Sequence, residues 1–115
     1  MRAYLPVTRP QLAALHEHGS LPGPLRGCVV DPAWRAGAPE VDEEEWEYEA
    51  QGSAAQALPD ATGFVLAVDV ERPAAAPDDG WVEVPGPVAR RDVAAVLDAE
   101  LAWFGVQELD ALLGA

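Results

Sequence analysis

Acidic side chains are concentrated in one short stretch of the sequence, VDEEEWEYEAQ, at residues 41–51. Six carboxylates fall within the eight residues from Asp42 to Glu49. Such a density suits cation binding or catalysis by carboxylates. It also suits a structural role, because acidic residues stabilise the first turn of a helix, where the helix dipole is positive. Each residue of the stretch therefore has to be assigned to one of these roles.

Most of the acidic stretch is explained by a capped helix with one solvated face. Asp42 takes the N-cap position, Glu45 follows three residues later, and Glu43 to Glu45 form the first turn. At 100° per residue, one side of this helix is apolar and carries Trp46, Ala50, Ala54 and Ala57. The remaining acidic residues lie mainly on the opposite side, which predicts a solvated face.

The capped helix does not explain the position of Glu43 and Glu47. They are spaced i and i+4 and project on the apolar side, where two like charges destabilise the helix. Two interpretations are open: this end of the helix extends beyond the core, or the pair meets a cation.

Arg90 and Arg91 are the only local concentration of positive charge, and they suit either a solvated turn or a clamp for a carboxylate or phosphate. We expect at least one of these arginines to lie within ion-pair distance of Glu43 or Glu47, and we take the four residues as candidate ligand- or partner-binding residues.

Other reactive side chains lack the neighbours that chemistry requires. His16 and His18 are two residues apart, so they point to nearly opposite sides of a helix and miss the spacing of a zinc site. Cys28 is the only cysteine and is followed by two valines, which predicts a buried thiol in a strand. Residues 78–80, Asp-Asp-Gly, lack the further oxygen ligands of a calcium loop and predict a turn. With no nucleophile elbow or phosphate loop, we predict no catalytic residue, no metal site and no cofactor.

Composition limits the classes of partner. The chain has 115 residues, a formal net charge of −13 and 50% hydrophobic residues, which predicts one folded domain. Nucleic acid and anionic membranes are not expected partners, because both require a basic patch. A basic protein or a cation fits the charge better, although acidic charge also keeps a protein soluble. Lysine, isoleucine and asparagine are absent, a bias typical of a high-GC genome.

The apolar segments of the sequence are short. The N-terminal residues MRAYLPVTRP contain two prolines and no continuous apolar region, so they do not predict a secretory signal. The runs FVLAV and VAAVL are too short to span a bilayer. We therefore expect a cytoplasmic protein.

Capping signals mark the first helix and the elements around it. Thr8 and Gln11 have capping-box spacing and Gly19 is a natural terminator, which predicts a helix over residues 9–18 after a short apolar strand at 3–7. A second strand is predicted at 26–30, followed by a short helical turn that begins with Asp31-Pro32. Further strands are predicted at 63–70 and from residue 81. The Pro/Ala-rich segment 72–80 between them predicts a flexible loop.

The segment DVAAVLDAELAWF at residues 92–104 fits two structures. Its apolar residues suit one helix, which its alanine and leucine content favours. They also suit a hairpin with strands at 93–97 and 100–104 around Asp98-Ala99. The following residues, VQELDALL, predict a helix in both cases.

The order of these motifs resembles a family of short, acidic, uncharacterised actinobacterial proteins, a domain of unknown function. The segments that carry the resemblance are MRAYLPVTRPQLAAL, CVVDPAWR, DEEEWEYEAQ, VEVPGPV before VAAVL, and LAWFGVQELDALL. Family members have a longer acidic insert between the VAAV and LAWF segments, which is absent here. The resemblance implies that these two segments are separate strands, because an insert would interrupt a continuous helix. We therefore predict a single two-layer α+β domain, with a mixed β-sheet and two to three helices on one side.

Two classes of function remain open at this stage. The first is a non-enzymatic cytoplasmic binding or regulatory module that contacts another protein or forms a homodimer. The alternative is a small carboxylate-based or cation-dependent enzyme built around Glu43 and Glu47. An enzyme requires a concave pocket in which polar groups converge, whereas a binding module requires an exposed contact surface.

Overall fold

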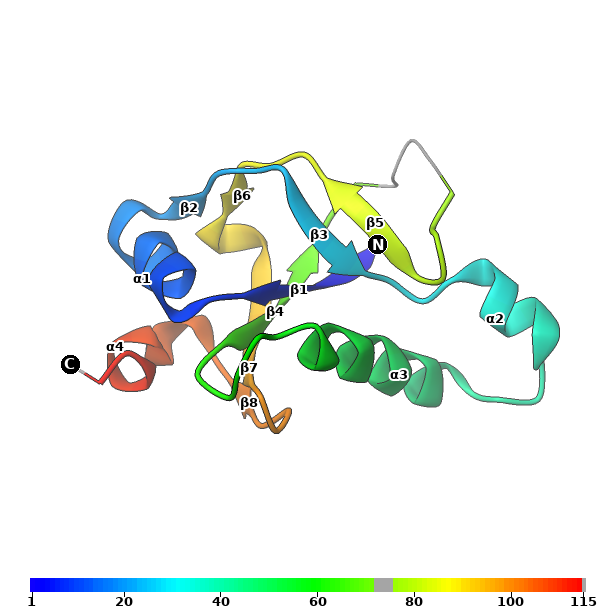
Figure 1. Cartoon of the computed structure of the whole chain (residues 1–115). Helices are drawn as coiled ribbons and strands as arrows, with labels where there is room; N and C mark the ends of the chain where they lie inside the picture. Colours follow the sequence, from blue (N-terminus) through cyan, green and yellow to red (C-terminus); the bar gives the residue numbers. More distant parts are fainter. Residues whose placement is uncertain (72–75, 115) are drawn as a thin grey trace.

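Six strands form one open sheet in the computed structural model, which describes residues 1–71 and 76–114 (Figure 1). The strands are β1 (Arg2–Val7), β3 (Leu25–Cys28), β4 (Phe64–Asp69), β5 (Trp81–Val84), β7 (Val93–Asp98) and β8 (Trp103–Phe104). Their spatial order is β5-β3-β1-β4-β7-β8, and each neighbouring pair is antiparallel. Two shorter strands, β2 (Ser20–Leu21) and β6 (Val88–Ala89), pair with each other outside this sheet.

The central strand β1 pairs with β4 over its whole length, from Arg2 opposite Asp69 to Val7 opposite Phe64. Side chains alternate between the two faces of a strand. Leu5 and its neighbours at alternate positions belong to one core cluster, whereas Tyr4 belongs to the other. Both faces of the sheet are therefore buried at its centre.

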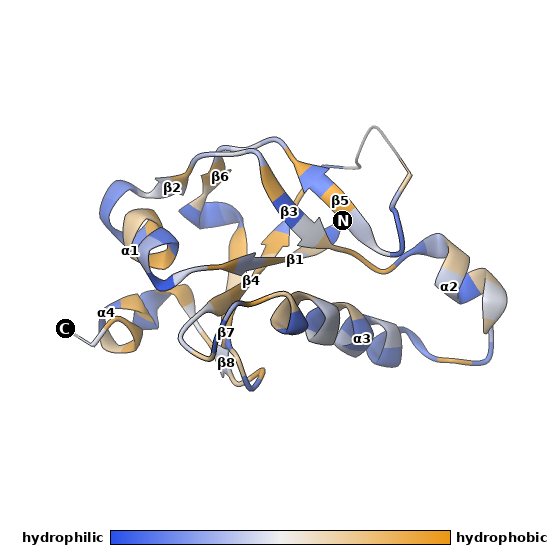
Figure 2. Cartoon of the chain, viewed as in Figure 1, coloured by the Kyte–Doolittle hydropathy of each residue, from blue (hydrophilic) through white to orange (hydrophobic). Residues whose placement is uncertain are grey.

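The helices are shared between these two faces (Figure 1). One face is covered by α1 (Arg9–His18) and the short α4 (Leu109–Leu112), whose leucines lie in the first core cluster. The other face is covered by α3 (Glu43–Gln56), which contributes Ala50 and Ala54 to the second cluster. The short helix α2 (Pro32–Gly37) precedes α3. Figure 2 shows hydrophobic residues running through β4, whereas hydrophilic residues recur along α3.

The predicted α+β class is confirmed. In detail, the strand pairs are antiparallel rather than mixed, and the helices lie on both faces rather than on one side. The reason is the burial pattern of β4, whose first five residues are all buried. A strand with apolar side chains on both faces requires a covering layer on each.

The helix starts predicted from capping signals are confirmed. Thr8 Oγ1 accepts a hydrogen bond from the Gln11 backbone N–H at 3.2 Å, and Gln11 Oε1 accepts one from the Thr8 N–H at 2.8 Å. Gly19 ends α1 with a φ of 74°. Asp42 caps α3 by accepting a hydrogen bond from the Glu45 N–H at 3.0 Å. These contacts are local, so sequence spacing was enough to predict them.

The end of the chain contains the hairpin rather than one long helix. Leu97 of β7 is opposite Trp103 of β8, and Asp98 Oδ1 accepts hydrogen bonds from the backbone of Glu100 and Ala102 in the turn between them. Pairing of β7 with β4 outweighs the helix propensity of its alanines. The predicted final helix is a 3₁₀ turn, η2 (Val106–Glu108), followed by α4.

The predicted loop at 72–80 is described only in part, because residues 72–75 lie outside the described residues. The predicted turn at its end is confirmed. Asp79 and Gly80 have φ values of 48° and 87°, and the backbones of Asp78 and Trp81 exchange two hydrogen bonds across them. Positive φ at both central residues is typical of a type I′ hairpin turn.

Candidate functional site

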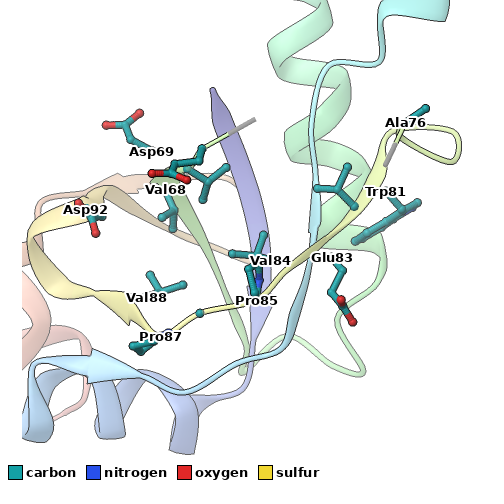
Figure 3. A pocket seen from close by; sticks show the side chains of 14 residues that line it. Val68, Asp69, Ala76, Trp81, Glu83, Val84, Pro85, Pro87, Val88 and Asp92 are labelled. Carbon is teal, nitrogen blue, oxygen red and sulfur yellow. The ribbon is translucent and has the colours of Figure 1, made fainter. Parts of the chain in front are cut away.

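One hollow lies on the α1 side of the sheet, between β4, β5 and β6, and has a volume of about 860 Å³. Figure 3 shows Val68, Val84 and Val88 around the same space, whereas Glu83 points away from it. The valines are buried members of the core, and carboxylates stand at the edges of the hollow. Ligand sites need a few polar groups that converge on one point. The carboxylates in this lining, Asp69, Glu71, Glu83 and Asp92, instead come from different segments around valine and proline walls.

A second hollow lies on the opposite face, between α3 and β8, and we call it the α3–β8 groove. Its volume is about 680 Å³. It is lined by Arg2, Tyr4, Glu44, Glu47, Tyr48, Gln51 and Trp103. Its lining is mainly polar and aromatic, and it contains one of the four residues singled out in the sequence, Glu47.

The register of the sheet accounts for the floor of the α3–β8 groove. Tyr4 is opposite Ala67, which in turn is opposite Ala95, so small side chains keep the sheet surface low beside the tyrosine. Trp103 is opposite Leu97 and so projects to the same face, where α3 lies. The tyrosine and the tryptophan therefore stand on the same side of the sheet as α3.

One side of α3 forms the wall of the groove. Glu44, Glu47, Tyr48 and Gln51 are spaced i, i+3, i+4 and i+7, so they form a stripe along the helix. The helix carries its buried alanines, Ala50 and Ala54, on a separate stripe. The alanine stripe packs in the core, whereas the other stripe, which includes the buried Gln51, lines the groove.

A hydrogen-bonded cluster connects this wall to the floor. The Tyr4 hydroxyl donates to Glu47 Oε2 at 2.7 Å, and Gln51 Nε2 donates to the Tyr4 oxygen at 3.4 Å. Burial, together with the hydrogen bond to Glu47, raises the pKa of Tyr4 to about 12, although the Gln51 contact opposes this. At neutral pH the phenol is therefore protonated and holds the carboxylate in place. A phenol with so high a pKa is a poor general acid or base.

Two exposed aromatic side chains line the groove, one from α3 and one from β8. Tyr48 on α3 is 65% exposed and Trp103 on β8 is 53% exposed. Among the described residues, the other large hydrophobic side chain with comparable exposure is Met1. Aromatic residues are enriched where proteins bind partners.

The structure separates Glu43 from Glu47. Glu43 accepts hydrogen bonds from both Nε and Nη2 of Arg35, with the Nε contact at 3.0 Å, and this pairing raises the pKa of Arg35. Both interpretations of the glutamate pair hold in part: Asp42 to Glu45 are exposed, so this end of α3 extends beyond the core, and Glu43 also meets a cation. The cation is Arg35 on α2, so the ion pair joins two neighbouring helices rather than facing the groove.

The expected contact between the arginine pair and these glutamates is wrong. Arg90 and Arg91 lie in the 3₁₀ turn η1 (Arg90–Asp92) after β6. Arg90 donates from its backbone N–H to Gly19 O at 2.9 Å and from Nη2 to Val106 O at 3.4 Å. The flanking valines, Val88 and Val93, pack in the α1-side core, whereas α3 packs on the other face. A role of the arginine pair in binding stays a prediction.

Comparison with known protein families identifies one family to which the sequence is similar. The model of DUF6912, a family of unknown function, matches residues 1–97. The chain belongs to this family. No curated protein and no solved structure shows significant similarity to it. The match contains the four α3 residues of the groove and Tyr4, and it ends before Trp103.

The remaining candidate residues of this DUF6912 chain have structural contacts. His16 Nε2 lies 2.6 Å from Asp110 Oδ1, so the histidine joins α1 to α4. Cys28 is buried as predicted, and burial raises the pKa of its thiol to about 11. Within the described part of the chain, no three His, Cys, Asp or Glu residues are grouped to hold a metal ion. Nor does any helix there have the length and apolar character to cross a membrane.

The sequence alone did not identify most of the groove. Tyr4 lies in an apolar strand, where the sequence predicts a core residue. Trp103 could be placed only once the hairpin register was known. The spacing of Glu44, Glu47, Tyr48 and Gln51 was a usable signal, because a polar stripe beside an apolar one indicates a second contact surface on a helix.

Proposed function

We propose that this DUF6912 protein is a non-enzymatic binding module that acts through protein contacts at the α3–β8 groove. The observation that supports this proposal is the exposure of Tyr48 and Trp103 in the lining of one hollow. Exposed aromatic side chains are costly in water and contribute strongly to binding once a partner covers them. The cluster of Tyr4, Glu47 and Gln51 at the base of the groove supplies fixed polar groups beside them.

The carboxylate-based enzyme has less support. Glu43 is paired with Arg35, and Glu47 with Tyr4, so the two carboxylates do not converge on one point. The groove lining contains a second carboxylate, Glu44, but Glu47 is already hydrogen-bonded to the neutral phenol of Tyr4. A binding role uses the same contacts without requiring a proton transfer.

The proposal also covers the class of partner, the cellular location and the source of the protein. We take the partner to be another protein or a second copy of this chain, rather than nucleic acid or a membrane, because the net charge of −13 repels phosphate. A single buried cysteine is consistent with a cytoplasmic protein. The absence of lysine, isoleucine and asparagine supports an actinobacterial, high-GC source.

Site-specific photo-crosslinking tests the proposal. A benzophenone amino acid is introduced in place of Tyr48 or Trp103, and at Arg91 as a control on the other face. We expect one identified polypeptide, or a covalent dimer of this chain, to be crosslinked from both groove positions and not from position 91. Equal labelling from position 91, or no discrete product from the groove, would count against the proposal.

A further inference from the structure

The carboxylates and aromatic rings of the α3–β8 groove fit one class of partner group. We infer that the groove binds an arginine side chain carried by a basic segment of the partner protein. This inference rests on the proposed binding function and specifies the chemistry that the partner must present.

Charge complementarity is the first argument. Glu44 and Glu47 line the groove, and the one cation in its lining, Arg2, is paired with Asp69 at 3.0 Å. Without a free cation in the lining, the groove presents negative charge on a protein whose formal net charge is −13. A negatively charged hollow on a negatively charged protein favours a basic segment and repels an acidic one.

The geometry of Glu47 is the second argument. Its Oε2 accepts the Tyr4 hydrogen bond, which fixes the carboxylate. No hydrogen-bond donor from residues 1–71 or 76–114 reaches its Oε1. A carboxylate that is already held in position binds a charged donor with less loss of side-chain entropy.

The aromatic walls are the third argument, and they favour arginine over lysine. A guanidinium group is planar and weakly hydrated, so it stacks on an aromatic ring while its edge donates to a carboxylate. The protein makes this type of contact elsewhere, since the guanidinium carbon of Arg26 lies 4.6 Å from the ring centre of Trp81. Tyr48 and Trp103 offer the same surface beside Glu47, without a residue of the chain stacked on them among the described aromatic contacts.

A peptide titration followed by NMR of the ¹⁵N-labelled full chain tests this inference. The probes are the blocked peptide Gly-Arg-Gly-Arg-Gly and analogues with citrulline or lysine in place of arginine. Citrulline keeps the shape of arginine and removes its charge. We expect the indole N–H signal of Trp103, assigned with Trp103→Phe, to shift with the arginine peptide. The Kd should be at least roughly fivefold below that of the citrulline peptide, and lysine should be intermediate.

Two variants of α3 assign the effect to the groove. Glu47→Gln keeps an oxygen acceptor for Tyr4 and removes the charge, so it should weaken arginine binding by about fivefold or more. Glu45→Gln removes the same charge from the same helix outside the groove, and its effect should stay below about twofold. Equal binding of the arginine and citrulline peptides, or equal effects of the two variants, overturns the inference.

The crosslinking experiment separates this inference from the broader proposal. A partner that crosslinks at positions 48 and 103 through an arginine-containing segment supports both. A partner, including a second copy of this chain, that crosslinks there through a neutral or acidic segment supports the binding function and overturns the arginine inference. No product at either position overturns both.

Discussion

The hydroxyl group of Tyr4 donates a hydrogen bond to Oε2 of Glu47 at 2.7 Å and so joins the central strand of the sheet to α3. The two residues are 43 positions apart in the sequence. Tyr4 is only 2% exposed, and Glu47 is half-buried. The contact therefore fixes the groove wall to the sheet. It also contributes to the stability of the folded protein.

Removing the Tyr4 hydroxyl should destabilise the protein. Tyr4→Phe leaves a carboxylate oxygen and the Gln51 amide without their partner, which should lower the free energy of unfolding by about 1–2 kcal/mol. Tyr48→Phe is the matched control, because that side chain is exposed, and its effect should be below about 0.5 kcal/mol. Urea unfolding at pH 7 measures both. Equal effects of the two variants would show that the buried hydrogen bond does not contribute.

The contribution of Tyr4 to the free energy of unfolding should decrease at alkaline pH. Its pKa is raised from 10.0 to about 12 in the folded protein, because the buried phenol is favoured in its neutral form. The unfolded chain loses this proton at lower pH than the folded chain, so the stabilisation is complete below about pH 10 and is lost as pH rises towards 12. The stability difference between wild type and Tyr4→Phe should fall by up to about 1.4 kcal/mol per pH unit in this interval.

Urea unfolding of both proteins at several pH values between 8 and about 12 measures this change. The raised pKa of Cys28 affects wild type and variant alike, so it cancels in the difference. A difference that stays constant across the interval would contradict the predicted role of the phenol.

Two glycines should respond in opposite ways to substitution by alanine. At Gly80, φ is 87°, and an added Cβ would lie 2.7 Å from the Trp34 ring and 3.0 Å from the Val29 carbonyl oxygen. Gly80→Ala should therefore destabilise the protein by about 2 kcal/mol or more. Gly52 lies within α3, and beyond its chain neighbours and the helix backbone no atom lies within 4 Å of the added Cβ, so Gly52→Ala should stabilise by about 0.5–1 kcal/mol. Thermal unfolding distinguishes the two signs directly.

Ion-pair coupling should exist within the α2–α3 pair and be absent between the opposite faces. Glu43 and Arg35 are both about half exposed, so a double-mutant cycle to alanine should give a coupling of about 0.3–1 kcal/mol that decreases with salt. The cycle Glu47→Ala with Arg91→Ala should be additive, because these residues lie on different faces. A coupling above about 0.5 kcal/mol in the second cycle would contradict the described arrangement.

Local signals predicted the elements well, because a cap is decided by residues three or four positions apart. Thr8, Gly19 and Asp42 are examples, and each has the backbone contact that its spacing predicts. The β7–β8 hairpin required more than local propensity, which favours a helix there. Its stabilising contacts come from β4, about thirty residues earlier in the chain, and no local pattern contains them.

Of the residues that line the candidate groove, only Glu47 was predicted as a site residue from the sequence. Glu47 was recognised because a charge on the apolar side of a helix demands a partner. The identity of that partner depends on which strand lies under α3. The spacing of Glu43 and Glu47 does not predict the strand order. Arg90 and Arg91 precede β7, which contributes Ala95 and Leu97 to the core cluster on the α3 face, yet their turn lies on the opposite face of the sheet.

The central position of β1 has a consequence for the protein as it is synthesised. β1 needs neighbours on both sides and leaves the ribosome before either of them, and its full-length partner, β4, begins only at Phe64. At roughly 5–20 residues per second, several seconds pass before that partner exists. Meanwhile α1 can form from its own caps, whereas β1 exposes unpaired backbone and apolar side chains. Closing the sheet then requires a long-range contact, so nascent β1 can pair with the wrong chain before β4 is available.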